Sequence, residues 1–259
     1  MMKRLYFVCM ICITFLLNGC GNRAVFIVVG HGDDQLAVVS DDEIHTADSF
    51  GLSASFQGEN IVITESDSDA IVAEILIPFD KNQVSLSMID ENAGYLLYCS
   101  TGAMGFMNKY LYVTEDRWAT FDEIDISSLI DGYPTSLSAL SLEHIYIGTD
   151  MRSNGYLFET TDGGITWDSV SVDEGYYRYG YVPLLDENNG VMYVLLEYEE
   201  NNRSYYNLYQ SDINATLWEK IGGFSLDVSG SSFQVCQFFM RDGTLYFYDS
   251  QGNRYQITL

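Results

Sequence analysis

The chain has 259 residues, of which 47% are hydrophobic and 19% charged, enough to form the core of one sizeable domain. Its 37 acidic residues against 12 basic ones give a formal net charge of −25 at pH 7. An electrostatic field of this sign repels polyanions, so we expect no nucleic-acid partner. The abundance of aromatic residues, 14% of the chain, together with only 3 prolines, is typical of a strand-rich domain.

The first residues have the pattern of an export signal. Lys3 and Arg4 precede an almost unbroken apolar run from Leu5 to Leu17. This run of about 13 residues is shorter than the roughly 20 that span a bilayer. The pattern therefore favours a cleaved signal peptide, with a retained membrane anchor or a core strand as the alternative.

The residues that follow the apolar run are Asn18, Gly19 and Cys20. With Leu17 they resemble the lipobox of bacterial lipoproteins, in which the peptide is cut before the cysteine and the thiol is acylated. The resemblance implies a signal peptide over residues 1–19 and a lipid on Cys20. It also implies a short tether over residues 20–23 and a location on the outer face of a bacterial cell membrane.

Residues 24–259 show no stretch with the Pro, Gly or Ser density of a linker, so we predict a single domain. Short strands bounded by polar or Gly-bearing turns are predicted along its whole length. They cover residues 24–29, 35–39, 51–56, 60–64, 70–77, 84–89, 95–99, 109–115, 118–124, 136–141, 145–148, 155–160, 165–172, 179–185, 191–198, 205–210, 216–221, 232–239, 244–248 and 254–258.

Four short strands in every ~40–50 residues are typical of a β-propeller blade. We predict an all-β propeller of about five four-stranded blades, with six as the alternative. Residues 35–80 would form one blade. The strand at 24–29 would complete the C-terminal blade and close the ring, which removes exposed sheet edges.

A turn motif recurs in the middle of the chain. In its best copy Asp162 is followed by Gly164, Thr166 and Trp167. The two weaker copies begin at Asp116 and Asp212. Each copy keeps an aspartate, a threonine four residues later and a large apolar residue at or next to the fifth place; the residues in the weaker copies are Trp118, Thr120 and Phe121, and Asn214, Thr216, Leu217 and Trp218.

A second marker accompanies two of these copies. The segment Asp90 to Gly94 precedes Asp116 at the same separation at which the segment Asp186 to Gly190 precedes Asp212. In the middle copy, Leu142-Glu143-His144 stands in roughly this place. The paired markers predict a structural repeat.

The chemistry of the motif is that of a tight turn. An Asp side chain can accept hydrogen bonds from N–H groups just ahead of it, and Gly163 and Gly164 can adopt positive φ. Trp167 would then begin the next strand and bury a large apolar area. We therefore predict that Asp116, Asp162 and Asp212 are structural residues and not catalytic ones.

These turns resemble the Asp-box (BNR) repeat of the sialidase-like propeller superfamily over roughly residues 81–225. That superfamily includes exported sugar-binding proteins, glycosidases and photosystem-assembly factors. In it the Asp-box is a turn at the blade periphery, away from the active site, so the resemblance implies a fold more than a function.

A sialidase of this superfamily would be expected to bind the substrate carboxylate with a clamp of arginines. Leu76-Ile77-Pro78 stands where an Arg-Ile-Pro tripeptide would be sought, with Leu in place of Arg. Arg117 lies inside a turn motif and Arg23 in the tether. The pattern weighs against sialic acid cleavage, while carboxylate pairs for another glycoside hydrolysis stay open.

The densest aromatic cluster is Tyr176, Tyr177, Arg178 and Tyr179. Its rings could stack on sugar faces or on a peptide, and Arg178 could bind a carboxylate. Strand alternation would place Tyr177, Tyr179 and Tyr181 on one face, where the packing of blades would bury them. Packing is the favoured interpretation, and ligand binding is the alternative.

Two cysteines, Cys99 and Cys236, remain after the signal and lipid positions, as buried free thiols or as a disulfide. No Cys/His spacing resembles a zinc site, and we predict no cofactor. Acidic clusters at residues 33–34, 41–43 and 65–69 could hold Ca²⁺ through oxygen ligands. None has an EF-hand spacing, so solvated turns are the favoured interpretation.

Together these features predict a lipid-anchored extracytoplasmic propeller with a non-catalytic binding or scaffolding role. The predicted ligand is a polysaccharide or an envelope protein at the cell surface. The alternatives are a glycoside hydrolase of the sialidase-like superfamily and an accessory factor for assembly of a membrane complex.

Overall fold

The computed structural model describes residues 36–38, 50–77, 80–101, 107–150, 155–186, 189–201, 203–215, 217–227, 237–241, 244–248 and 254–257. All regular secondary structure in these residues is β-strand. The described part of the chain holds no helix that is long and apolar enough to cross a membrane. The predicted signal peptide, Cys20, the tether and the predicted strand at 24–29 lie outside the described residues.

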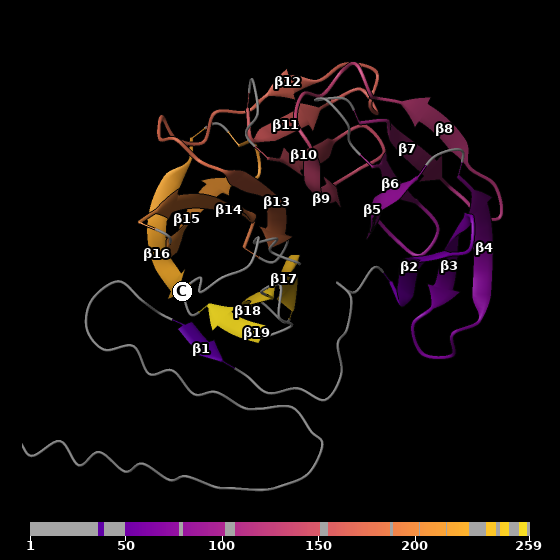
Figure 1. Cartoon of the computed structure of the whole chain (residues 1–259), viewed down its shortest axis with the longest axis horizontal. Helices are drawn as coiled ribbons and strands as arrows, with labels where there is room; N and C mark the ends of the chain where they lie inside the picture. The colour runs from indigo at the N-terminus through magenta and orange to yellow at the C-terminus, as the bar shows by residue number, and fades with distance from the viewer. Residues whose placement is uncertain are drawn as a thin grey trace, which may run out of the picture.

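The described strands form antiparallel sheets that follow one another along the chain (Figure 1). The first sheet contains β2 (Leu52–Gln57), β3 (Asn60–Glu65) and β4 (Ile71–Leu76), and the second contains β5 (Lys81–Met88), β6 (Gly94–Ser100), β7 (Lys109–Thr114) and β8 (Asp122–Asp125). The third contains β9 (Pro134–Ala139), β10 (Ile145–Thr149), β11 (Leu157–Thr160) and β12 (Asp168–Ser169). The fourth contains β13 (Tyr179–Asp186), β14 (Val191–Glu200), β15 (Arg203–Asp212) and β16 (Glu219–Asp227). The last contains β17 (Gln237–Arg241), β18 (Thr244–Tyr248), β19 (Arg254–Ile257) and β1 (Leu36–Val38).

Successive sheets touch through their leading strands. β5 contacts β2, β9 contacts β5, β13 contacts β9, and β17 contacts β13. Figure 1 shows the sheets arranged along an arc, with each leading strand on its inner side. An all-β chain of antiparallel, mostly four-stranded sheets in this arrangement fits a β-propeller, as the strand spacing predicts.

The outer edge of the last sheet differs from the sequence prediction. β1 pairs antiparallel with β19, and Leu36 lies opposite Ile257. The strand expected at 35–39 therefore belongs to the C-terminal sheet, where 24–29 was expected, and not to the first sheet. The two segments have similar strand propensity, so local sequence does not tell which of them pairs with the C-terminus.

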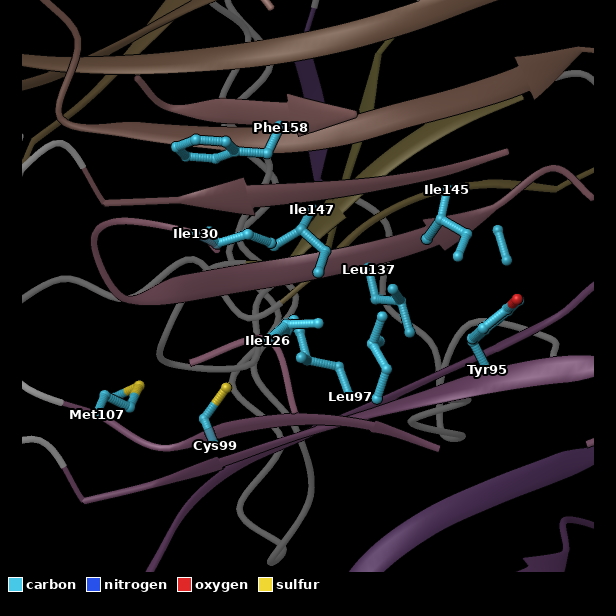
Figure 2. Packing of buried hydrophobic residues seen from close by; sticks show 12 residues of the cluster. Tyr95, Leu97, Cys99, Met107, Ile126, Ile130, Leu137, Ile145, Ile147 and Phe158 are labelled. Carbon is cyan, nitrogen blue, oxygen red and sulfur yellow. The ribbon is translucent and has the colours of Figure 1, made fainter. Parts of the chain in front are cut away.

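The second strands β6 and β10 are buried on both faces, and β6 shows the consequence. All of its residues are buried. Tyr95, Leu97 and Cys99 pack against the third sheet, whereas Leu96 and Tyr98 pack with residues of the first sheet. Figure 2 shows the former set facing residues of the third sheet, which are Leu137, Ile145, Ile147 and Phe158. Burial of each large apolar side chain contributes about 1.5–3 kcal/mol.

The third and fourth sheets approach closely at two glycines. A Cβ on Gly180 would lie 2.2 Å from the backbone oxygen of Tyr156, and a Cβ on Gly148 would lie 2.1 Å from the backbone oxygen of Gly180. Two hydroxyl groups of β9 add polar contacts to β13. Thr135 Oγ1 donates to Gly180 O at 2.7 Å, and Val182 N donates to Ser136 Oγ at 3.1 Å. The sheet interface therefore needs glycine at these two places.

Gly180→Ala should lower the free energy of unfolding by about 1–3 kcal/mol, because the added methyl group overpacks this interface. Urea denaturation measures the loss. Gly222→Ala is the matched control, since a Cβ there meets nothing within 4 Å. Equal stability of the two variants would contradict the close approach of Tyr156 and β13.

Candidate functional site

The sheets present two ends with different chemistry. We call the end with the turns at residues 115–121, 161–167 and 213–218 the turn end. We call the opposite end, where β13 begins at Tyr179 and β14 finishes at Glu200, the loop end. The predicted structural residues lie at the turn end, and the predicted ligand-binding residues lie at the loop end.

Asp162 organises the turn between β11 and β12. Its Oδ1 accepts hydrogen bonds from the Thr160 hydroxyl at 2.7 Å and from the N–H groups of Ile165 and Thr166 at 3.1 and 2.9 Å. Its Oδ2 accepts from the Thr166 hydroxyl at 2.6 Å. The carboxylate is saturated by its own turn, which leaves little capacity for chemistry on a ligand.

Glycine and tryptophan complete this turn. Gly163 and Gly164 have φ values of 75° and 96°, in the region that favours glycine. Trp167 donates from Nε1 to Gly164 O at 3.1 Å and packs against the core between the second and third sheets.

The Asp116 turn repeats the same bonds. Thr120 N donates to Asp116 Oδ1 at 2.8 Å, and the Thr120 hydroxyl donates to Oδ2 at 2.7 Å. The Thr114 hydroxyl donates to Asp116 Oδ1 at 3.1 Å. Arg117 and Trp118 occupy the two glycine places with φ values of 55° and 67°, so the expected strand at 118–124 begins only at Asp122.

Thr114 and Thr160 are residues that the sequence analysis missed. Each lies two positions before the aspartate, and its hydroxyl bonds the aspartate and the backbone of the same turn. A threonine at this offset in both copies was visible in the sequence as a signal.

The third turn is shifted by one residue relative to the sequence alignment. The Ser211 hydroxyl donates to Leu217 O at 2.7 Å, six residues later. The Thr114 hydroxyl, whose one proton is shared between two acceptors, lies 2.9 Å from Thr120 O, also six residues later. These bonds align Ser211 with Thr114. The structural alignment of the third turn therefore differs by one residue from the alignment that starts at Asp212.

In this register Ile213 stands at the place of the aspartate. Ala215, with φ of 50°, takes the second glycine place. Asp212 accepts from Asn214 N at 3.0 Å and forms a small turn of its own. Thr216 lies outside the described residues. In the third turn, Ile213 and Leu217 stand where the other two turns have the aspartate and the threonine that bonds to it.

The companion turns contact the aspartate turns through the backbone. Arg117 N donates to Asn92 O at 2.8 Å, and Gly163 N donates to Glu143 O at 3.0 Å. Glu143 therefore takes the place of Asn92 in the middle repeat, which settles the register that the sequence leaves open there. Asp90 accepts from two N–H groups of its own turn, which lowers the pKa of its carboxyl.

At the loop end the four predicted ligand residues separate into different environments. Tyr176 is 81% exposed, whereas Tyr177 is only 4% exposed. Tyr177 precedes β13 and packs with residues of the third and fourth sheets, while Tyr179 and Tyr181 face the last sheet. The expectation that all three tyrosines share one strand face was therefore wrong, because regular alternation starts only at Tyr179.

Tyr177 belongs to a buried hydroxyl cluster. Its hydroxyl donates to Asp173 Oδ2 at 2.8 Å, lies 2.6 Å from the Tyr209 hydroxyl and accepts from Asn207 Nδ2 at 3.2 Å. Tyr209 also donates to Asp173, and these two tyrosine hydroxyls lower the pKa of the Asp173 carboxyl. The cluster fixes the segment on which Tyr176 stands.

Arg178 and Tyr179 lie side by side at the start of β13. The Arg178 guanidinium pairs with the Glu199 carboxylate, and its Cζ lies 5.2 Å from the centroid of the Tyr179 ring. Both members of the ion pair are partly exposed. Tyr176 and Arg178 are thus the two predicted ligand residues with solvent-accessible chemistry.

Glu197 is a buried acid near this site that the sequence analysis did not single out. Its oxygens accept from the Tyr181 hydroxyl and from the Ser204 hydroxyl, both at 2.9 Å. Burial raises the pKa of its carboxyl, and the residue is 0% exposed. A substrate cannot reach it in this structure, so it acts as a structural group between strands.

Cys99 is a buried free thiol, and burial raises its pKa to about 12. Cys236 lies outside the described residues. In the part of the chain that the structure describes, no group of three or more His, Cys, Asp or Glu side chains is placed to hold a metal ion. Of the acidic clusters, only residues 65–69 are described, and there Glu65 pairs with Arg117.

No protein-family profile matches the chain, and no curated protein sequence matches it. Solved structures with a similar course of the chain include YCF48 bound to D1 peptide, at 10% identity and a TM-score of 0.38, covering 88% of this chain and 98% of that one. The GH43_1 enzyme from Xanthomonas citri is 12% identical with a TM-score of 0.46, covering 86% and 82%.

The GH74 xyloglucanase from Xanthomonas campestris is 16% identical with a TM-score of 0.44, covering 80% of this chain. This chain spans only 36% of that enzyme's length. These likenesses are too distant to carry an argument, and it is the antiparallel, mostly four-stranded sheets of this chain that fit a β-propeller.

The Asp162 turn should respond to acid. Hydrogen bonds from Thr166 hold the pKa of Asp162 at about 2, below its ordinary 3.8. A carboxyl whose pKa is lower in the folded state contributes stability above its unfolded pKa, and that stability is lost as the pH falls toward the folded value. We expect the contribution of Asp162 to fade between about pH 4 and pH 2.

Asp162→Ala should therefore lower the urea midpoint at pH 7 and lose less stability than the wild type between pH 4 and pH 2. Asp212→Ala should lower the midpoint less, because in the third turn Ile213, and not Asp212, aligns with Asp162. Parallel acid profiles of Asp162→Ala and the wild type would contradict the role of this carboxylate.

Proposed function

We propose that the protein is an exported, lipid-anchored β-propeller that binds a polysaccharide or an envelope protein at its loop end. The supporting observation is the contrast between Tyr176, which is 81% exposed, and the next residue, Tyr177, which is held in a buried hydroxyl cluster. A large exposed ring on a fixed backbone segment offers contact area at a small cost in conformational entropy.

The chemistry around Tyr176 supports this role. Two residues further along the chain, the ion pair of Arg178 and Glu199 places a guanidinium and a carboxylate beside the Tyr179 ring. Sugar hydroxyls and peptide groups both bond to such planar charged side chains. Glu197, an acid on β14 whose pKa is raised by burial, is enclosed by hydroxyl groups and therefore does not favour hydrolysis.

We also propose a closer relation for the fold. The repeated turns around Asp116 and Asp162 support an Asp-box propeller related to the sialidase-like superfamily, with five blades and a ring closed by the pairing of β1 with β19. In that arrangement the Asp-boxes lie at the turn end, away from the proposed ligand.

Tyr176→Ala should weaken binding of the full chain to a cell-envelope fraction at least tenfold, without changing the urea midpoint, because the ring is exposed. A pull-down against separated polysaccharide and membrane-protein fractions measures the effect. Ile165→Ala, which changes a residue that is 71% exposed at the turn end, is the control.

Unchanged binding of Tyr176→Ala would reject the loop-end site. Release of a chromogenic leaving group from a glycoside by the wild-type chain would instead support the hydrolase alternative.

The lipid anchor makes a separate prediction. Cys20→Ala should abolish incorporation of radiolabelled palmitate and release the chain from the membrane fraction, since the resemblance to a lipobox assigns acylation to this thiol. Cys99→Ala is the control, because Cys99 is buried in the domain core. Equal palmitate labelling of Cys20→Ala and the wild type would remove the anchor from the proposal.

A further inference from the structure

A pocket of about 540 Å³ lies at the turn end, between the first and second sheets. It is lined by Phe50, Glu91, Asn92 and Arg117. It is a shallow hollow that is wide open to solvent, although its volume lies within the ~300–1,000 Å³ of small-molecule sites. These residues come from three separate turns, so the pocket exists only because the two sheets meet there.

Two of the lining residues have unusual backbone conformations. Phe50 and Arg117 have φ values of 52° and 55°, in the left-handed region that side chains disfavour. Gly163 occupies the place of Arg117 in the equivalent turn of the third sheet. Glycine adopts positive φ without strain, whereas arginine does not. The turn therefore keeps the Arg117 side chain at a cost in backbone strain.

Arg117 is held in one orientation by three hydrogen bonds. Its Nη2 donates to both oxygens of the Glu65 carboxylate, at 3.0 and 3.1 Å. Its Nη1 donates to Glu91 O at 3.1 Å. Because Nη2 is held by the Glu65 carboxylate and Nη1 by the Glu91 carbonyl, the plane of the guanidinium is fixed, and it becomes a preformed wall of the pocket.

Phe50 adds an apolar aromatic ring to the pocket, and this residue is 46% exposed. The pocket therefore combines an accessible aromatic ring with a carboxylate, a carboxamide and a guanidinium. An apolar ring face pairs with the C–H face of a sugar, and planar polar groups bond to its hydroxyls. This combination suits a polyol with one apolar face.

The charge of the pocket selects among such ligands. Glu65 neutralises Arg117, and Glu91 adds a negative charge. The whole chain carries −25 at pH 7. Uronates, sialic acids and phosphates would be repelled by this field.

We infer that the pocket formed by Phe50, Glu91, Asn92 and Arg117 is a binding site for a neutral saccharide, separate from the loop-end site. It lies at the other end of the sheets from Tyr176. Saccharide binding at the turn end therefore does not depend on the proposed loop-end function, and an experiment can contradict either one without the other.

The test is titration of the full chain with neutral cellotetraose and maltotetraose and with anionic trigalacturonate, followed by saturation-transfer NMR and calorimetry. We expect at least one neutral oligosaccharide to bind and the uronate not to bind. Phe50→Asn and Arg117→Gly should each weaken that binding at least tenfold. Asparagine and glycine tolerate positive φ, so the two variants remove the phenyl ring and the guanidinium without adding backbone strain.

Tyr176→Ala and Ile165→Ala serve as controls and should bind the neutral oligosaccharide as the wild type does. Absence of binding by both neutral probes would overturn the inference, as would tighter binding of the uronate. Binding that survives Phe50→Asn but is lost in Tyr176→Ala would also overturn it, while leaving the loop-end site intact.

Discussion

Burial of both faces of the second strands, β6 and β10, is the constraint on which the other features depend. Along β6, Leu97 packs toward the third sheet and the adjacent Leu96 toward the first, and both are fully buried. A strand of this kind has no face left for a ligand. Near these strands, a ligand can therefore meet exposed polar and aromatic groups only beyond the strand ends, which is where the turn-end pocket and the loop-end segment lie.

Sheet packing and the loop-end site are joined through one residue. The backbone oxygen of Tyr156 lies where a side chain on Gly180 would be, so it fixes how closely the third and fourth sheets approach. The hydroxyl of the same tyrosine donates to Asp173 O at 2.9 Å and accepts from Asp173 N at 3.1 Å. Asp173 in turn holds Tyr177, so the position of Tyr176 follows from the packing of two sheets.

Local sequence predicts the features whose partners are local. The strand spacing gives the all-β propeller architecture, and the bonds of Asp162 lie within one short turn. Three features escape such reasoning because their partners are distant in sequence: the pairing of β1 with β19, the burial of Tyr177 beside Tyr209, and the contact of Arg117 with Glu65. The register of the third turn was missed for another reason. Asp212 directly precedes Ile213, the residue that aligns with Asp116, so the sequence suggested an alignment that is wrong by one residue.

The proposed function requires that the packed sheets present a preformed recognition surface at the loop end. Hydrogen exchange of the full chain, measured with and without the envelope fraction that it captures, tests this requirement. Residues 174–179 and 197–200 should gain protection from exchange on binding, while the strands of the core are already protected in the free chain. Ligand binding without added protection in these two segments would contradict a preformed loop-end site.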